Sequence, residues 1–484
     1  AVNLVTRRVL AENSAMISAG RFDLYRGVVM GGSELGPFHT LFAIEGAGQD
    51  GPFENPEDYN RYKLFARGGY EDGAWRSDLT FASYRGTWHA SGQLPLREVR
   101  AGRLDRFGSI DPTEGGTSQR HQMSSRTVWS PDDREEASLF AYGVYYDLDM
   151  FSNFTFFARD PVNGDQIEQK DKRWFGGTEA RYVRRVDVGG FETSFLGAAG
   201  FRGDHIGEQL NYSVQRDFLT RQTDHNVRQV NSFAYVSADT TWLPWLRTVI
   251  GLRFDDLYFD VDNNLNSTTD PTLTGQGTKN EAIFSPKASI ILSPIADTDV
   301  FLNYGEGFHS NDARGVVRDV DPVDPSAKAR GAELGVRTRL FDRLEVAAAF
   351  WMLDLDSEIV FVGDEGTTEA SGATRRVGGE LEVRYRILDW LFFDVDYTQT
   401  VAKFRFEPDQ ADDVPLAPRF TVNGGLTARR EDGFFGSLRT RAISSRPANE
   451  DNSLRAAGYT IWDLQVGKRF DLPESWTGGH VKAL

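Results

Sequence analysis

The sequence lacks three features that would assign it to familiar classes of protein. It contains no cysteine, which fits a chain exported without stray thiols. No apolar stretch approaches the roughly 20 residues that a membrane-spanning helix requires, so an inner-membrane location is excluded. Basic residues are not in excess either, because the formal net charge is −17, and this charge argues against a nucleic acid as partner.

Enzyme motifs are also missing. The sequence has no Gly-x-Ser-x-Gly elbow, no glycine-rich phosphate-binding loop and no His-Glu-x-x-His pair. Acidic pairs such as Glu135-Glu136 and Asp255-Asp256 do occur, but they fall at strand ends or turns, where solvated carboxylates are ordinary. We therefore expect no catalytic residue, no cofactor and no dedicated metal site.

The sequence does contain a regular alternation of strand-like runs with connections that are by turns short and long. Tyr70 to Gly73 and Arg430 to Gly433 are short connections, whereas Ala90 to Gln119 and Gly203 to Val227 are long and polar. Short turns on one rim and long loops on the other are typical of a membrane β-barrel that handles ligands on one side. The pattern therefore predicts an all-β chain.

The expected strands have a period of two. In the run from 380 to 387, leucine, valine, tyrosine and isoleucine alternate with glutamate and arginine. About twenty such strands would offer more apolar surface than the core of one soluble domain can bury, whereas lipid can accept it. A closed barrel also pairs every backbone N–H and C=O group without leaving an edge. We expect the apolar faces to contact lipid and the charged faces to line a wet lumen.

The number of strands indicates the type of barrel. The runs amount to roughly twenty strands and the start of another, and single-chain bacterial barrels have even strand numbers. The 22-stranded class is the one whose lumen is plugged. The sequence therefore predicts a transmembrane antiparallel β-barrel of the 22-stranded type with the last one or two strands missing. The last residues, Val481 to Leu484, fall within an expected strand, which would make the chain a fragment.

Several stretches resemble the TonB-dependent outer-membrane receptors. Ala1 to Arg8, AVNLVTRR, is similar to the last strand of that family's N-terminal plug domain, and Ser18 to Arg26 resembles the first barrel strand and its turn. Ser285 to Ser289 followed by Asn303 to Ser310 is similar to a signature that spans two mid-barrel strands. The resemblance covers the whole chain. It implies the end of a plug at residues 1–8 and a C-terminally truncated barrel at residues 9–484.

The resemblance implies a receptor in the bacterial outer membrane that imports a scarce ligand with energy supplied through TonB. It favours a metal complex, above all a ferric siderophore, while cobalamin, haem, copper and carbohydrate stay open. The implied partners are TonB, a small-molecule metal chelate and the lipid bilayer, with no nucleic acid, and the protein would be a monomer. The alternatives are a passive porin-like channel, which has no plug strand, and a barrel that only binds.

Histidines form the first group of candidate ligand-binding residues. Neutral imidazole can bind a transition metal or donate a hydrogen bond to an anionic chelate. The candidates border the expected long loops and are His89, His121, His205, His225 and His309. They are scattered and show no metal-ligand spacing, so chance accumulation on a polar rim is the simpler explanation.

A second candidate lies where an expected strand gives way to a long loop, in the stretch Phe308 to Arg314. An arginine at a loop base can grip a carboxylate, catecholate or phosphate through two parallel hydrogen bonds. Arg314 and His309 are therefore the first candidates for ligand contact. The alternative is structural, with Asp312 and Arg314 tying the loop to the barrel wall.

Overall fold

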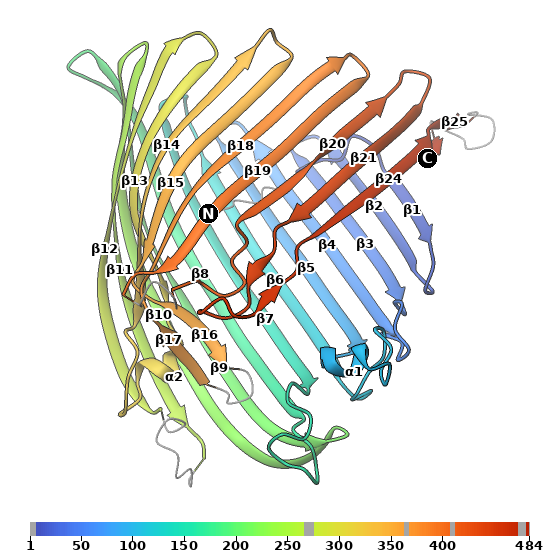
Figure 1. Ribbon diagram of the computed structural model, residues 1–484. Coiled ribbons are helices and arrows are strands. Elements are labelled where there is room, and N and C mark those ends of the chain that lie inside the picture. Colours follow the sequence, from blue (N-terminus) through green and yellow to red (C-terminus); the bar gives the residue numbers. More distant parts are fainter. Residues whose placement is uncertain (1–5, 266–274, 363–366, 407–411, 473–480, 484) are drawn as a thin grey trace.

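The structure is a computed structural model that describes residues 6–265, 275–362, 367–406, 412–472 and 481–483. Twenty strands form one continuous antiparallel sheet (Figure 1). They are β1 (Ser14–Ala19), β2 (Tyr25–Leu35), β3 (Phe38–Gln49), β4 (Tyr59–Asp72), β5 (Trp75–His89), β6 (Gly115–Trp129), β7 (Glu135–Ser152), β8 (Ile167–Val188), β9 (Phe191–Val214), β10 (Asp217–Leu243), β11 (Leu246–Asn263), β12 (Gly277–Ile295), β13 (Thr298–Ser310), β14 (Ser326–Leu340), β15 (Leu344–Leu355), β18 (Thr374–Leu388), β19 (Leu391–Phe404), β20 (Phe420–Arg429), β21 (Phe434–Ile443) and β24 (Tyr459–Lys468).

The remaining elements are small. Three hairpins pair apart from the main sheet, namely β16 (Glu358–Val362) with β17 (Thr367–Ser371), β22 (Arg446–Pro447) with β23 (Arg455–Ala456), and β25 (Phe470–Leu472) with β26 (Val481–Ala483). The part of the chain that the structure describes contains two helices, α1 (Leu96–Arg100) and α2 (Ala313–Val316). No helix within the described ranges is both long enough and apolar enough to cross a membrane.

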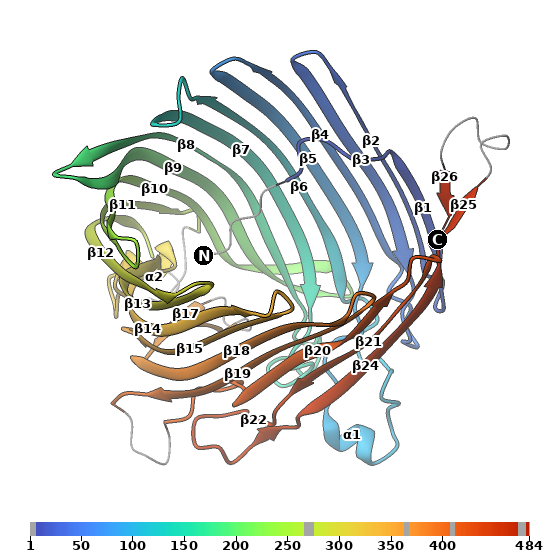
Figure 2. The same ribbon diagram turned by 90° about the horizontal axis from the view of Figure 1, so that it is seen from above.

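The main sheet is a meander that curls around a lumen (Figure 2). Strands pair in chain order, with β15 next to β18 and β21 next to β24 across the small hairpins. The two edges are β1 and β24, and no pairing joins them among the described residues. The prediction of an antiparallel transmembrane barrel with about twenty strands is confirmed, although the sheet does not close.

Only part of the predicted plug strand at residues 1–8 can be located. Residues 1–5 lie outside the described residues. Thr6 to Arg8 precede β1 and contact the inner side of the wall, where Arg67 donates a hydrogen bond to the Thr6 hydroxyl at 2.9 Å. The described end of this stretch therefore lies inside the barrel, not on its outer surface.

Short connections gather at one rim, which we call the short-turn rim, and long loops gather at the opposite long-loop rim (Figure 1). Gly189 and Gly190 join β8 to β9 with φ angles of 63° and 92°. A two-residue hairpin turn of type I′ needs positive φ at both central residues, and glycine adopts it without steric cost. The paired glycines therefore allow this hairpin to close with only two connecting residues.

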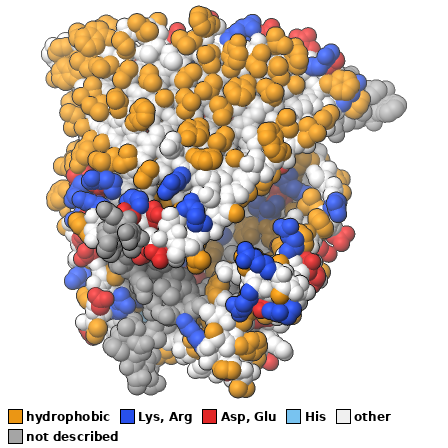
Figure 3. Space-filling model, viewed as in Figure 1, with side chains coloured by type: hydrophobic (Ala, Val, Ile, Leu, Met, Phe, Trp, Pro, Cys, Tyr) orange, Lys and Arg blue, Asp and Glu red, His pale blue; other side chains and the backbone are white. Residues whose placement is uncertain are grey.

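Outward-facing side chains form an apolar band next to the short-turn rim (Figure 3). Exposed members of the band include Leu139, Val236, Ile250 and Leu334. Aromatic rings border it at two levels. Trp75 and Trp129 lie near the short turns with ring centroids 6.3 Å apart, and Tyr145 and Trp174 lie farther along at 4.6 Å. An apolar band between aromatic girdles is the lipid-contacting surface of a transmembrane barrel.

Strands β9 and β10 continue beyond this band towards the long-loop rim. They contain 24 and 27 residues, whereas a tilted strand needs only roughly 9–11 residues to cross the hydrocarbon. The excess length, together with the long β8 and β11, makes a wall past the level of Tyr145 and Trp174. The inner face of this wall can bury side chains of the loops that fold onto it.

The loop between β13 and β14 folds inward onto this wall and buries a small hydrophobic core. The core consists of Val227, Leu257, Phe259, Val261, Ile283, Ala313, Val316 and Val317. Residues of α2 thereby pack against the inner faces of β10, β11 and β12. Because removing apolar surface from water stabilises the packed state, this core holds α2 at a fixed position on the wall.

Candidate functional site

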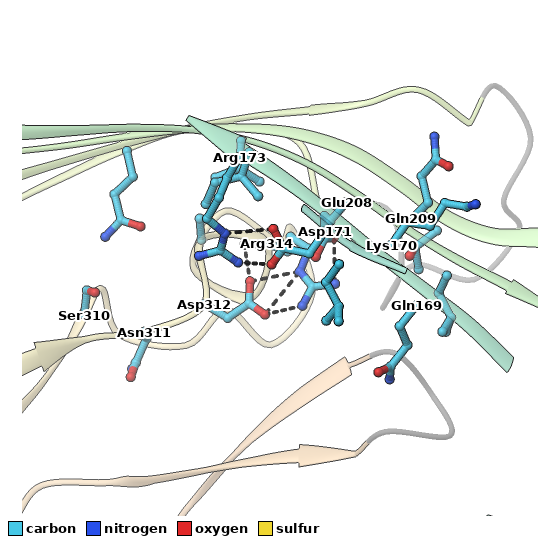
Figure 4. A pocket seen from close by; sticks show the side chains of 17 residues that line it. Gln169, Lys170, Asp171, Arg173, Glu208, Gln209, Ser310, Asn311, Asp312 and Arg314 are labelled. Atoms are coloured by element: carbon cyan, nitrogen blue, oxygen red, sulfur yellow. Dashed lines mark hydrogen bonds and ion pairs between the residues drawn. The ribbon is translucent and has the colours of Figure 1, made fainter. Parts of the chain in front are cut away.

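A polar pocket lies beside α2 on the inner face of the extended wall (Figure 4). Its volume is about 420 Å³, within the range of roughly 300–1,000 Å³ that small-molecule sites occupy. Strands β8, β9 and β10 form one side, and Ser310 to Arg314 form the other. The pocket therefore joins residues that are far apart in the sequence.

Arg314 is the centre of an ion-pair cluster at the edge of the pocket. Its Nη1 lies 2.7 Å from Glu208 Oε1 of β9, and its Nε donates to Asp312 Oδ1 at 2.9 Å. Asp312 also caps α2, because its carboxylate accepts the Arg314 backbone N–H at 3.0 Å. Burial alone would raise the pKa of Asp312, but the Arg314 guanidinium and backbone N–H outweigh it and lower that pKa. The cluster thus ties the loop to the wall through charged groups.

His225 of β10 joins the same cluster. Its Nδ1 lies 3.1 Å from Glu208 Oε1, and the residue is 2% exposed. Its Nε2 is buried and has no hydrogen-bond partner among the described residues. Three of the predicted residues, Asp312, Arg314 and His225, therefore meet through Glu208, which the sequence had not singled out. Glu208 pairs with His225 across β9 and β10 in the sheet register, and predicting that register would have identified it.

The other predicted histidines lie elsewhere. His121 stacks on Tyr145 in the aromatic row on the outer wall, with ring centroids 6.1 Å apart, and His205 lies opposite Trp174 in the same row. His89 is half-buried at the end of β5. His309 is exposed and adjoins the pocket only through its neighbour in the chain. The structure therefore does not bring the five histidines together.

The cations that line the pocket are paired. Lys170 Nζ lies 2.6 Å from Glu168 Oε1, and Arg173 donates to Asp171 at 2.7 Å. Two half-buried glutamine side chains, Gln169 and Gln229, add amide groups to the lining. No group of three His, Cys, Asp or Glu side chains able to hold a metal ion is found in the described part of the chain. The site can therefore offer hydrogen bonds from several directions with little net charge.

A second cluster of polar side chains joins two long loops to the short turn between β9 and β10. Asp111 accepts hydrogen bonds from Asn153 at 3.0 Å and from Gln166 at 2.9 Å. Arg216, in the connection between β9 and β10, donates to the Thr113 carbonyl at 2.6 Å. Glu114 lies beside this cluster and is 5% exposed, and its Oε1 has no hydrogen-bond partner among the described residues. Burial and the neighbouring Asp111 carboxylate raise the pKa of Glu114 to about 7.

This raised pKa makes the loop cluster sensitive to pH. In the closed loops the pKa of Glu114 is about 7, against an ordinary 4.5. The resulting stabilisation is complete below pH 4.5 and is lost as the pH rises through 7, because ionisation then penalises the buried carboxyl. The loss amounts to about 3 kcal/mol. We expect hydrogen exchange of the amides at 111–114, corrected for its intrinsic rate, to show faster opening at pH 8 than at pH 5.

Two variants test this pH dependence. Glu114→Gln keeps the shape of the side chain but cannot ionise, so loop opening should no longer depend on pH in this range. Glu98→Gln, on α1 in the same long connection, changes a carboxylate that already pairs with Arg103 at 2.6 Å and should leave the dependence intact. Equal pH profiles for wild type and Glu114→Gln would contradict the assignment.

The fold and the pocket together define a class of protein. The barrel has an apolar outer band, long loops at one rim and a polar pocket on the inner wall near those loops, and the outer band and the sorting of loops are typical of outer-membrane barrels. Residues 49–479 match the family described as TonB dependent receptor-like, beta-barrel. The chain belongs to this family of TonB-dependent receptors, whose members are outer-membrane receptors and transporters and not enzymes. The resemblance noted in the sequence is thereby confirmed.

Solved structures of similar fold include several iron receptors. The ferric citrate transporter FecA in its unliganded form has a TM-score of 0.79 and 15% identity, covering 95% of this chain and 70% of that one. The ferric-catecholate import receptor Fiu from E. coli K12 has a TM-score of 0.77 and 15% identity, covering 96% of this chain and 76% of that one. The siderophore receptor PiuA from Acinetobacter baumannii has a TM-score of 0.79 and 12% identity, covering 97% of this chain and 76% of that one. At these identities the likeness establishes the fold alone.

Proposed function

We propose that the protein imports a ferric siderophore or a related metal complex across the bacterial outer membrane, with energy supplied through TonB. The observation that carries this proposal is the polar pocket of about 420 Å³ on the inner wall at the long-loop rim. Long loops face the cell exterior in such barrels, so a ligand arriving from the medium would meet this pocket first. Residues 1–8 would be the end of the plug and residues 9–484 the barrel.

The chemistry of the pocket favours an intact chelate over a bare ion. Its cations are already paired with carboxylates, so the available interactions are hydrogen bonds, to which Gln169 and Gln229 contribute amide donors and acceptors. The oxygen atoms of a metal chelate are suitable acceptors for such donors. The names of FecA, Fiu and PiuA refer to ferric citrate, ferric catecholate and siderophores, and this supports iron as the metal.

Uptake in cells tests the proposal. The full-length protein should restore growth under iron limitation to a strain that lacks its own receptors, with a panel of ferric siderophores supplied one at a time. Accumulation of radioactive iron should require TonB, whereas binding at the cell surface should not. Accumulation that persists without TonB, or free permeation of small sugars into liposomes containing the full-length protein, would instead support a passive channel.

Two glutamine variants locate the binding site. Gln169→Ala and Gln229→Ala should each weaken binding of the transported chelate about fivefold, since one hydrogen bond contributes about 1 kcal/mol. Gln119→Ala is the control, because that amide bonds to Asp147 at 3.2 Å on β7 and does not line the pocket. Equal affinities for all three variants would place the ligand elsewhere.

A further inference from the structure

A separate cluster of charged side chains lies inside the barrel near the short-turn rim, on β3, β4 and β5. Its centre is Asp78 of β5, which is buried. Arg67 of β4 forms a two-pronged ion pair with it, with Nε 3.1 Å from Oδ1 and Nη2 2.8 Å from Oδ2. His39 of β3, also buried, places Nε2 2.8 Å from Oδ1. The carboxylate therefore fixes both a guanidinium and an imidazole.

A glycine makes this arrangement possible. His39, Gly69 and Asp78 are register partners on three successive strands, so Gly69 lies between the two side chains that bond. A β-carbon at Gly69 would lie 2.1 Å from His39 Nε2. The missing side chain thus leaves the space in which His39 reaches across β4 to Asp78.

The cluster holds the segment of chain that leads to β1. The edge of the Arg67 guanidinium that Asp78 does not use donates from Nη1 to the Thr6 hydroxyl at 2.9 Å and to the Thr6 carbonyl at 3.3 Å. Arg8 continues the contact, with Nη2 2.5 Å from Glu71 Oε2. Figure 2 shows this segment, in dark blue, passing β5, β4 and β3 on its way to β1.

We propose that His39, Arg67, Glu71 and Asp78 form a seat that anchors the incoming chain at residues 6–8 to the barrel wall. Strand β1 is only six residues long, so tension on an unanchored incoming segment would load its few hydrogen bonds first. The seat takes up that load at β3, β4 and β5 instead. Asp78 prevents Arg67 from swinging away, and Gly69 permits the His39 contact that orients Asp78.

Limited trypsin digestion of the full-length protein in detergent tests the seat. Trypsin cleaves after arginine, and the seat should shield the bonds after Arg7 and Arg8 while the exposed Arg97 on α1 is cut. Arg67→Gln removes the grip on Thr6 and should accelerate cleavage after Arg7 and Arg8 about tenfold or more, because proteolysis follows the population of the locally open state. Mass spectrometry identifies the cleaved bonds.

Adjacent glycines supply a matched pair of variants. Gly69→Ala forces His39 off Asp78 and should also accelerate cleavage, whereas Gly68→Ala adds a methyl group that meets nothing within 4 Å and should leave the rate at the wild-type value. The proposal is overturned if Arg67→Gln stays protected, if the two alanine variants behave alike, or if wild type is cut at Arg7 as fast as at Arg97. The digestion requires neither ligand nor TonB. The proposed seat can therefore be correct even if the import proposal is wrong.

Discussion

Replacing Arg314 by methionine should release the loop between β13 and β14 from the barrel wall. Arg314 and Glu208 are mostly buried, with side chains 18% and 21% exposed, and Asp312 is equally enclosed. Arg314→Met keeps the length of the side chain but leaves two carboxylates without their cation. Removing one partner of a buried ion pair costs about 3 kcal/mol or more, which corresponds to on the order of 100-fold more of the open loop.

The lack of native cysteine makes this loop opening easy to measure. A single Val317→Cys reporter lies in the core beneath the loop, and its rate of labelling by a maleimide reports how often the loop opens. The rate should rise on the order of 100-fold when Arg314→Met is added. Arg339→Met, which breaks an exposed pair with Glu345, should leave it unchanged. Unaltered labelling in Arg314→Met would show that other contacts hold the loop.

Phe259→Ala should open the same loop without altering any charge. Phe259 of β11 is 0% exposed and packs in the core with Val316 and Val317. Removing a buried phenyl ring costs about 3–5 kcal/mol through lost transfer energy and the cavity that remains. The Val317→Cys reporter should therefore label at least on the order of 100-fold faster.

Phe284→Ala is the control for this variant. Phe284 lies on the neighbouring β12, but it is 62% exposed and packs in a tilted arrangement against Phe254 outside the core, with ring centroids 5.0 Å apart. Loop opening should be the same as in wild type. If both phenylalanine variants label the reporter equally fast, a general loosening of the barrel would explain the result, and the packing of α2 on Phe259 would not.

The strands could be predicted from the sequence because their signals are local. Alternation with a period of two is visible within one strand, and in β18 the apolar members of the alternation, such as Val377 and Leu381, are indeed exposed on the outer face. Turn residues such as Gly189 and Gly190 mark where a hairpin reverses. Both signals depend on neighbours a few residues apart, so the number of strands followed from them. The expected long connection from Gly203 to Val227 was wrong, because those residues extend β9 and β10 and leave only a two-residue turn between them.

The arrangement of the candidate site could not be predicted in the same way. Arg314 contacts Glu208 only because α2 packs on β10, β11 and β12. No local sequence pattern predicts a contact between two residues that are so far apart in the sequence. The sequence shows only that the histidines lie near long loops. The face of the strand on which each histidine lies decides which side chains it contacts. His121 and His205 face outward, whereas His225 faces inward and pairs with Glu208.

The outer aromatic row at Tyr145 and Trp174 has a consequence for how recognition and passage are arranged. The pocket is lined by residues at or past this row, such as Leu148 and Glu208, so it sits at the height of the head groups or above them. The part of the wall beyond the aromatic row can therefore change in sequence to suit a different ligand, while the part embedded in hydrocarbon keeps the apolar residues that membrane insertion requires. A captured molecule would still have the full thickness of the bilayer ahead of it.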